Sequence, residues 1–287
     1  MLPLESVPNF SEGRDRPTID AIGHALSAYA QVLDVHADAD HNRSVFTVVG
    51  GDDALVEALV AGVAVAKERI DLRTHDGAHP RIGAADVVPL VPLRPGDMER
   101  ARAAALRAGE RIGTELGLPV FVYEPPSRGP AYYRRAGLQE RIDAGEVVPD
   151  FGPSRLHPSA GGVILGARRP LIAFNVNLRG DLRVAREVAA LVREKGGGFP
   201  GVRALGLDLP TAGLVQVSMN VEDWEAAALH EIVGRITAES DARGAEVVGS
   251  ELVGLMRGGA AAAAAGALLR IDGFDASHLL ELRLLER

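Results

Sequence analysis

The sequence of 287 residues contains no cysteine. Disulfide bonds, thiolate nucleophiles and cysteine-ligated metal ions are therefore excluded. Aromatic residues make up only 4% of the chain, so the hydrophobic core must be built from aliphatic side chains. No apolar run reaches the roughly 18 residues that a membrane span requires, and residues 1–5 lack the basic start and apolar stretch of a signal peptide. We therefore expect a cytoplasmic protein with no membrane partner.

The chain is acidic, with a formal net charge of −8 at pH 7, which disfavours nucleic acid as a partner. It contains neither the Gly-Lys-Ser/Thr of a phosphate loop nor the Gly-x-Ser-x-Gly of a serine hydrolase. Its glycine-rich stretch 196–201 follows a predicted helix, whereas a dinucleotide loop opens one. With 47% hydrophobic and 24% charged residues, the composition is that of a globular protein long enough for two domains.

Strand-like and helix-like segments alternate, and the order strand–helix–strand–strand–helix–strand occurs twice. The first round predicts strands at 4–8, 32–35, 44–49 and 85–93 with helices at 17–29 and 55–70, followed by helix 97–116, strand 120–123, short helix 138–144 and an apolar segment at 162–167. The second predicts strands at 171–177, 202–209, 214–221 and 247–252 with helices at 181–195 and 223–243, followed by helices at 260–269 and 276–286.

The fold class is therefore α/β, of the α+β type, with two similar subdomains at 1–170 and 171–287. We expect each subdomain to hold a mixed β-sheet with helices mainly on one face. Two prolines, Pro89 and Pro92, lie in strand 85–93 and predict an edge or bulged strand, because proline cannot donate a ladder hydrogen bond.

A first polar cluster, Asp34–Arg43, lies between two predicted strands. A calcium loop would need glycine and glutamate where Arg43 and Val49 stand, so that type of site is excluded. Three interpretations stay open. The cluster is a zinc or di-metal site using His36 and His41, a polar turn whose side chains satisfy backbone donors, or a substrate-binding loop in which Arg43 contacts an anion.

A second cluster, Arg73–Gly83, contains His75 and His79 four residues apart, a spacing that on a helix suits a metal ion. The glycine and proline within the segment disfavour a helix, and a proline directly after His79 favours extended backbone. We therefore expect a rigid loop that presents His79 for proton transfer and Arg81 for a carboxylate. The alternative is that both are solvated loop residues.

A long stretch rich in proline and glycine, 125–162, is expected to be mostly irregular, which in a compact enzyme is usually functional or mobile. Its last part, Pro149–Gly162, carries Ser154, Arg155, His157 and Ser159 on turns.

Several segments carry a likeness to a known family, in the same order along the chain. They are Val7–Gly13, His41–Arg43, His75–Asp86, Pro149–Ser154, Leu171–Asn177, Gln216–Asn220 and Gly249–Gly254. Together they resemble the glutamate formimidoyltransferases, the folate-dependent transferases of histidine breakdown, over nearly the whole chain.

The resemblance implies two similar subdomains facing each other across a folate-binding cleft, and usually a homodimer. It implies transfer of the formimidoyl group from N-formimidoyl-L-glutamate to N5 of tetrahydrofolate, which gives 5-formimidoyltetrahydrofolate and L-glutamate. Tetrahydrofolate is then a co-substrate, and no metal is expected. His79 matches the family's catalytic histidine, which we expect to take the proton from N5 and to pass it to the departing glutamate nitrogen.

The resemblance also implies which residues bind the two substrates. The segment that matches the family's folate-contacting stretch comprises Phe151, Gly152, Pro153, Ser154, Arg155, Leu156, His157, Pro158, Ser159, Ala160 and Gly161. Further candidates for substrate binding are Asn9, His36, Asp38, Asn42, Arg43 and Arg81. We expect Arg43, Arg81 and Arg155 to meet substrate carboxylates.

The sequence departs from its relatives at His36, where some members carry an acidic residue that Asp34 or Asp38 would have to replace. Animal members continue into a cyclodeaminase domain, and we expect that second activity to be absent here. Three alternatives stay open: an enzyme that processes 5-formyltetrahydrofolate by formyl transfer or cyclo-ligation, a non-catalytic folate-binding protein, and a metal-dependent hydrolase. The last would use His36, His41, His75 and His79.

Overall fold

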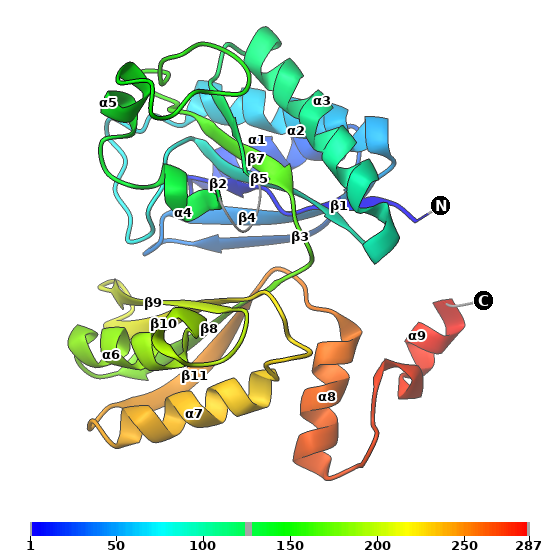
Figure 1. The fold of residues 1–287 in the computed structure, drawn as a ribbon, viewed down its shortest axis with the longest axis vertical. Helices are drawn as coiled ribbons and strands as arrows, with labels where there is room; N and C mark the ends of the chain where they lie inside the picture. The colour runs from blue at the N-terminus through cyan, green and yellow to red at the C-terminus, as the bar shows by residue number, and fades with distance from the viewer. Residues whose placement is uncertain (1, 124–127, 286–287) are drawn as a thin grey trace. The chain divides into compact units, whose positions relative to one another are not determined.

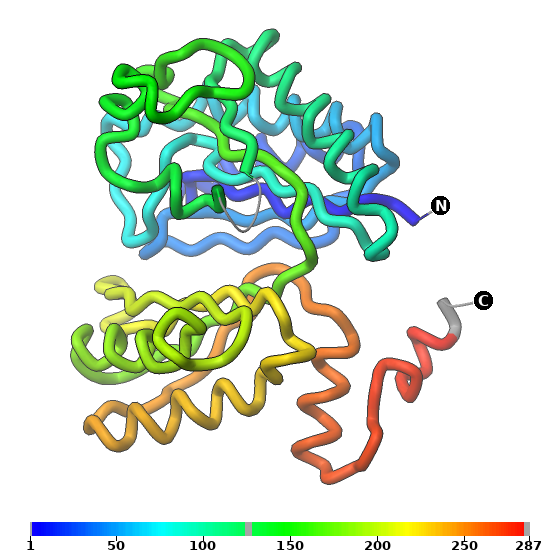
Figure 2. Tube along the Cα trace, viewed as in Figure 1, coloured from blue at the N-terminus to red at the C-terminus, as the bar shows by residue number. Residues whose placement is uncertain are grey.

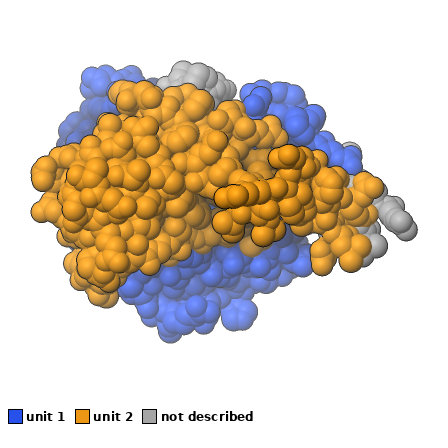
Figure 3. Space-filling view, turned by 90° about the horizontal axis from the view of Figure 1, so that it is seen from below, with its two compact units in different colours: residues 1–170 blue, residues 171–287 orange. Residues whose placement is uncertain are grey.

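The computed structural model describes residues 2–123 and 128–285 (Figure 2). The chain divides into two compact units, Met1–Pro170 and Leu171–Arg287, which Figure 3 colours separately. Each unit has its own β-sheet and its own hydrophobic core. Residues 125–127 of the predicted irregular stretch and residue 286 of the last predicted helix lie outside the described residues.

Unit 1 follows the predicted order of elements. It contains β1 (Leu4–Ser6), β2 (Asn9–Phe10), α1 (Arg16–Ser27), β3 (Gln31–Asp38), β4 (Arg43–Gly50), α2 (Asp52–Arg69), β5 (Ala85–Pro92), a 3₁₀ turn (Pro95–Asp97), α3 (Met98–Glu115), β6 (Val120–Val122), α4 (Pro130–Tyr133), α5 (Leu138–Asp143) and β7 (Val163–Ala167). The four predicted helices are confirmed to within a few residues, whereas α4 was not predicted.

The sheet of unit 1 is mixed, as predicted. Its strand order is β3-β4-β1/β2-β5-β7-β6, with β1 and β2 sharing one position between β4 and β5. The pairs β5–β7 and β6–β7 are parallel, and the others are antiparallel.

The prediction that strand 85–93 lies at an edge is wrong, because β5 is central and every residue in it is buried. The other half of the prediction, a bulged strand, agrees with the shift in register between β2 and β5, where Asn9 pairs with Val87 but Phe10 pairs with Ala85. The sheet tolerates Pro89 because the antiparallel partner of β5 is interrupted beside it. Ser6 pairs with Leu90 and Asn9 with Val87, which leaves residues 7 and 8 as a break between β1 and β2. Proline inside a sheet requires such a gap in the ladder.

Alternation along the strands gives the sheet of unit 1 two different faces. Helices α1, α2 and α3 lie on one face (Figure 1), where Phe10, Phe46 and Leu90 are fully buried in the main core. On the opposite face, the segment that carries α4 and α5 packs over β5, β6 and β7 through Tyr133 and its neighbours. The strands β2, β3 and β4 turn several polar side chains to that same face, beside the α4–α5 segment.

Unit 2 is a smaller sheet with two main helices on one face (Figure 1). Its elements are β8 (Ile172–Arg179), α6 (Leu182–Val192), a 3₁₀ turn (Glu194–Gly196), β9 (Val202–Leu209), β10 (Leu214–Val221), α7 (Leu229–Asp241), β11 (Glu246–Val253), α8 (Gly258–Leu269), a 3₁₀ turn (Ala276–His278) and α9 (Leu280–Leu285). The predicted strands at 202–209 and 214–221 are confirmed, and they pair as a hairpin. The predicted helix that follows residue 181 is confirmed as well, and the side chain of Asp181 caps it by accepting from the backbone N–H of Arg183 at 2.6 Å.

Three finer predictions for unit 2 are wrong. Its sheet is not mixed: the strands lie in the order β11-β8-β10-β9, and every neighbouring pair is antiparallel. Helix α7 begins at Leu229 and not near Asp223, because Asp223 caps a separate turn, with its Oδ1 accepting from the N–H of Ala226 at 3.1 Å. The last predicted helix is split into a 3₁₀ turn and α9.

The two units share one topology. Strands β5, β1/β2, β4 and β3 of unit 1 have the order that β11, β8, β10 and β9 have in unit 2. Both are the split β-α-β arrangement of ferredoxin-like folds, and unit 1 adds α3, β6 and β7. The repeated plan predicted from the sequence is therefore confirmed. In the described part of the chain, no helix is long and apolar enough to cross a membrane.

Candidate active site

The loop 73–83 is held by one guanidinium. Arg81 donates from Nε and one Nη to the carbonyl oxygen of His79, at 3.2 and 2.9 Å. Its other N–H groups reach the carbonyl oxygens of His41 (3.0 Å) and Asn42 (3.2 Å) and the ring of His75 (2.6 Å). An arginine has five N–H donors, and all five are occupied, so Arg81 fastens the loop to the turn between β3 and β4.

Asn42 ties a third segment into the same assembly. Its amide oxygen accepts from the backbone N–H of Gly13 at 3.0 Å, and its amide nitrogen donates to the carbonyl oxygen of Asp76 at 2.8 Å. Asn42 is buried and has a positive φ of 46°, a conformation that asparagine adopts more readily than most residues. The second interpretation of the Asp34–Arg43 cluster, a turn whose side chains satisfy backbone groups, therefore describes Asn42 well.

His79 has a defined tautomer. Its Nδ1 lies 2.9 Å from the carbonyl oxygen of Pro80, which can only accept, so Nδ1 carries the proton. The other nitrogen, Nε2, then has a lone pair available to take a proton. The ring is stacked on that of His41, with 6.1 Å between centroids, and keeps only part of its surface in contact with solvent.

The charges around His79 favour the neutral imidazole. Burial lowers the pKa of His79 well below 6.5, and the nearby guanidinium groups of Arg43 and Arg134 lower it further. Burial also lowers the pKa of Arg43 to about 10, so this arginine stays charged at neutral pH. His79 is thus unprotonated at neutral pH, which is the state that a general base requires.

Sequence analysis did not identify two charged residues near His79, Asp86 and Arg134. Asp86 is 1% exposed, and its Oδ1 accepts from the backbone N–H of Ile82 at 2.7 Å. Its Oδ2 forms an ion pair with Arg134, which follows α4. Asp86 is the last residue of the segment His75–Asp86 that resembles the family. No pattern in that segment indicates that Asp86 pairs with Arg134, 48 positions further along the chain.

The segment 151–161 lies directly beside the histidine loop. The N–H of Ala84 donates to the carbonyl oxygen of Ala160 (2.9 Å), and the N–H of Gly162 donates to that of Ile82 (3.0 Å). A Cβ on Gly161 would lie 2.0 Å from the carbonyl oxygen of Ile82, so this crossing requires glycine. The predicted folate-contacting segment and the predicted catalytic loop therefore meet through backbone hydrogen bonds.

His157 and Arg155 differ within that segment. The Nδ1 of His157 accepts from the backbone N–H of Ala160 at 3.1 Å, which makes His157 part of its own turn. Burial lowers its pKa. Arg155 is exposed.

The other predicted site residues share the face of the sheet of unit 1 that lies opposite α1, α2 and α3. The register pairs Asn9 and His36 with Val45 from either side, and Asp38 with Arg43, so all four polar side chains project to one face. The Oδ1 of Asp38 accepts from the backbone N–H of His41 at 2.6 Å. The structure thus brings His36, Asp38, Arg43 and Asn9 onto one surface.

On the helix-free face of unit 2, three further segments that resemble the family also meet. They are Leu171–Asn177, Gln216–Asn220 and Gly249–Gly254. The amide nitrogen of Gln216 donates to Oδ1 of Asn177 (2.9 Å) and to Oε2 of Glu251 (3.3 Å). Asn175 donates to the same oxygen of Glu251 at 3.1 Å.

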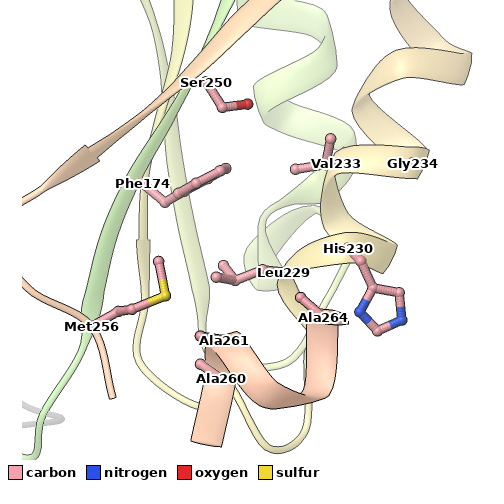
Figure 4. A pocket seen from close by; sticks show the side chains of 10 residues that line it. All are labelled: Phe174, Leu229, His230, Val233, Gly234, Ser250, Met256, Ala260, Ala261 and Ala264. Carbon is pink, nitrogen blue, oxygen red and sulfur yellow. The ribbon is translucent and has the colours of Figure 1, made fainter. Parts of the chain in front are cut away.

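The predicted site residues form no metal site within the described part of the chain, and none of them lines the pocket of unit 2. The described residues include no group of three histidine, aspartate or glutamate side chains arranged to hold a metal ion. A pocket of about 570 Å³ opens between α7, α8, β8 and β11 (Figure 4). Its lining is almost wholly apolar: Phe174, Leu229, His230, Val233, Gly234, Ser250, Met256, Ala260, Ala261 and Ala264.

Comparison with known proteins shows which families and proteins the chain is similar to. Residues 3–168 match the family model of the formiminotransferase domain, N-terminal subdomain, and residues 173–272 match that of the formiminotransferase domain. The chain is 37% identical to the glutamate formimidoyltransferase of Streptococcus pyogenes, over 98% of each chain. It is also 37% identical to that of Thermoplasma acidophilum, over 98% of this chain and 97% of that one. The rat formimidoyltransferase-cyclodeaminase is 41% identical over 88% of this chain and 50% of its own length.

Proposed function

This chain belongs to the formiminotransferase family, and on that premise we propose that it is a glutamate formimidoyltransferase. It transfers the formimidoyl group of N-formimidoyl-L-glutamate to N5 of tetrahydrofolate, its co-substrate, in histidine degradation. The products are 5-formimidoyltetrahydrofolate and L-glutamate.

The observation that carries the chemical proposal is the state of His79. The ring is held in one tautomer by the carbonyl oxygen of Pro80, and its pKa lies well below 6.5. A neutral imidazole with a free Nε2 can act as a general base, and its protonated form can then act as a general acid.

The reaction proceeds in two proton transfers through His79. N5 of tetrahydrofolate attacks the amidine carbon of formimidoylglutamate, and the new bond leaves an extra proton on N5. The Nε2 of His79 takes this proton and delivers it to the glutamate nitrogen. The bond from the amidine carbon to that nitrogen then breaks, which releases glutamate with a neutral amine. The fixed loop keeps the imidazole in position for both transfers.

The three arginines expected to meet carboxylates take different roles in this proposal. Every N–H of Arg81 is already used to hold the His79 loop, so Arg81 is a positioning residue. Arg43 makes no side-chain hydrogen bond or ion pair within the described residues, so its guanidinium is available to a substrate. Arg155 is exposed on the segment 151–161, which we propose as the folate-contacting surface.

Asn9, His36 and Asp38 remain candidates for substrate contact, supported by their common face and by the nearness of Asp38 to Arg43. We also propose that the protein is a cytoplasmic homodimer, on the strength of the family alone. Light scattering on the purified protein would test the subunit number.

The proposed function is tested by following tetrahydrofolate conversion by absorbance with formimidoylglutamate as donor. Turnover without ATP and in the presence of a chelator is the expected result. A requirement for ATP with 5-formyltetrahydrofolate would indicate a cyclo-ligase, and loss of turnover with the chelator would indicate a metal enzyme. Tetrahydrofolate binding without any turnover would indicate a non-catalytic folate-binding protein.

A further inference from the structure

Three guanidinium groups, those of Arg43, Arg81 and Arg134, and two carboxylates, those of Asp38 and Asp86, lie within electrostatic reach of one another beside His79. The pKa of Arg43 is lowered first by burial and then by the charge of Arg134, while Asp86 and Asp38 act in the opposite direction. The charges of Arg43 and Arg134 therefore act on one another, and Asp86 is the carboxylate that forms an ion pair with Arg134. Cations held together in this way are stabilised when an anion binds between them.

Arg134 differs from Arg81 in how much of its hydrogen-bonding capacity is used. One Nη of Arg134 donates to Asp86, and its Nε is buried without a hydrogen-bond partner in the described part of the chain. The side chain is 18% exposed, so the guanidinium borders solvent at one edge. Arg134 thus has donors left for a ligand, whereas Arg81 has none.

The fold holds Arg134 firmly at this place. The preceding Tyr133 is 1% exposed, and its hydroxyl donates to the carbonyl oxygen of Val122 at 2.9 Å. On the other side, Asp86 is fixed by the N–H of Ile82, one residue beyond Arg81. The same carboxylate thus joins Arg134 to the loop that presents His79.

We propose that Arg134, oriented by Asp86 and paired with Arg43, binds the α-carboxylate of the formimidoyl donor. This inference rests on the proposed function. The donor's reacting nitrogen is bonded to the carbon that carries its α-carboxylate, so an anion site next to His79 suits that group. The carboxylates of tetrahydrofolate are separated from N5 by the whole p-aminobenzoyl group and so lie far from the transferred proton. Arg134 therefore selects for an α-amino acid as donor, and Asp86 is a positioning residue.

The test compares two donors that differ only in the α-carboxylate: N-formimidoyl-L-glutamate and N-formimidoyl-4-aminobutyrate. Wild type should strongly prefer the first. Because Arg134→Gln alone leaves Asp86 as an unpaired buried carboxylate, the main variant is the double variant Arg134→Gln, Asp86→Asn. It should raise the KM for formimidoylglutamate by roughly 10- to 100-fold, as expected for a lost bond to a charged group. It should also abolish the preference between the two donors.

Two single variants, Arg134→Lys and Arg135→Gln, are measured beside the double variant. Arg134→Lys keeps the charge and should restore part of the preference. Arg135→Gln is the matched control, because Arg135 is exposed, lies 5.2 Å from the centre of the Tyr132 ring and should leave both constants unchanged. An unchanged donor preference in the double variant would overturn the proposal. A raised KM for tetrahydrofolate alone would also overturn it, because the anion would then be a folate carboxylate.

Direct binding of L-glutamate separates this inference from the proposed function. Calorimetry on wild type and the double variant needs no turnover. Binding by wild type that the double variant loses supports the site even if the transfer assay fails. Equal binding by both would overturn the site even if the transfer assay succeeds.

Discussion

Replacing Gly77 by alanine should displace His79, the proposed general base, without touching it. Gly77 lies in the loop that Arg81 fastens to residues 41 and 42. A Cβ at position 77 would lie 2.4 Å from the carbonyl oxygen of His41 and 2.5 Å from an Nη of Arg81. These are two of the groups that hold the loop, since that Nη donates to the same carbonyl oxygen. The new methyl group therefore enters the hydrogen-bonded clamp itself.

The size of the effect follows from the shortfall in distance. Ordinary contact begins at 3.4 Å, so the loop must move by about 1 Å to accommodate the methyl group. A displacement of about 1 Å at a reacting group can cost roughly 10²-fold in rate. We therefore expect kcat/KM of Gly77→Ala to fall by roughly 10²-fold, mainly through kcat, because His79 sits two residues further on.

The assay is tetrahydrofolate conversion with formimidoylglutamate, and Gly96→Ala is the matched control. Gly96 is an exposed glycine of unit 1 in the 3₁₀ turn Pro95–Asp97, and a Cβ there would meet nothing within 4 Å. The control should keep wild-type turnover, and both variants should unfold near the wild-type temperature. Equal turnover in the two variants would refute the claim that the clamp sets the position of His79.

Three further results are expected. The kcat/KM should rise with pH and level off with an apparent pKa below 6.5, because His79 must be unprotonated and its pKa is lowered; an acid limb above 6.5 would contradict this. For the same reason the unfolded chain binds that proton more tightly than the folded chain, so the melting temperature should fall as pH drops below 6.5; a melting temperature that does not change there would contradict it. Arg155→Ala should raise the KM for tetrahydrofolate by roughly 2- to 5-fold, as expected for one exposed charge pair, and an unchanged KM would remove Arg155 from the site.

Local patterns were sufficient for much of the fold. The patterns that predict helices α2 and α6 depend on neighbouring residues, and the structure confirms both helices. The position of β5 does not, because the break between β1 and β2 that accommodates Pro89 lies about 80 residues earlier in the chain. The order of strands in unit 2 is likewise a long-range property, which is why the prediction of a mixed sheet was wrong there.

In the candidate site, too, local features were predictable from the sequence and long-range contacts were not. The loop around His79 is a short continuous motif, so its rigidity was predictable from one proline and one glycine. Its clamp was not, because sequence alone assigns Arg81 to a carboxylate as readily as to backbone carbonyl groups. Arg134 carries no recognisable signal, since it follows a four-residue helix in a stretch expected to be irregular and acquires meaning only through Asp86.

The central claim is that His79 transfers the proton in formimidoyl transfer, and single-turnover kinetics of His79→Ala test it most directly. The variant should bind tetrahydrofolate as wild type does, while its rate of transfer falls by roughly 10²- to 10⁴-fold, the loss typical of a general base. His24→Ala, on the exposed face of α1, should keep the full rate. A rate for His79→Ala close to that of wild type would contradict the account.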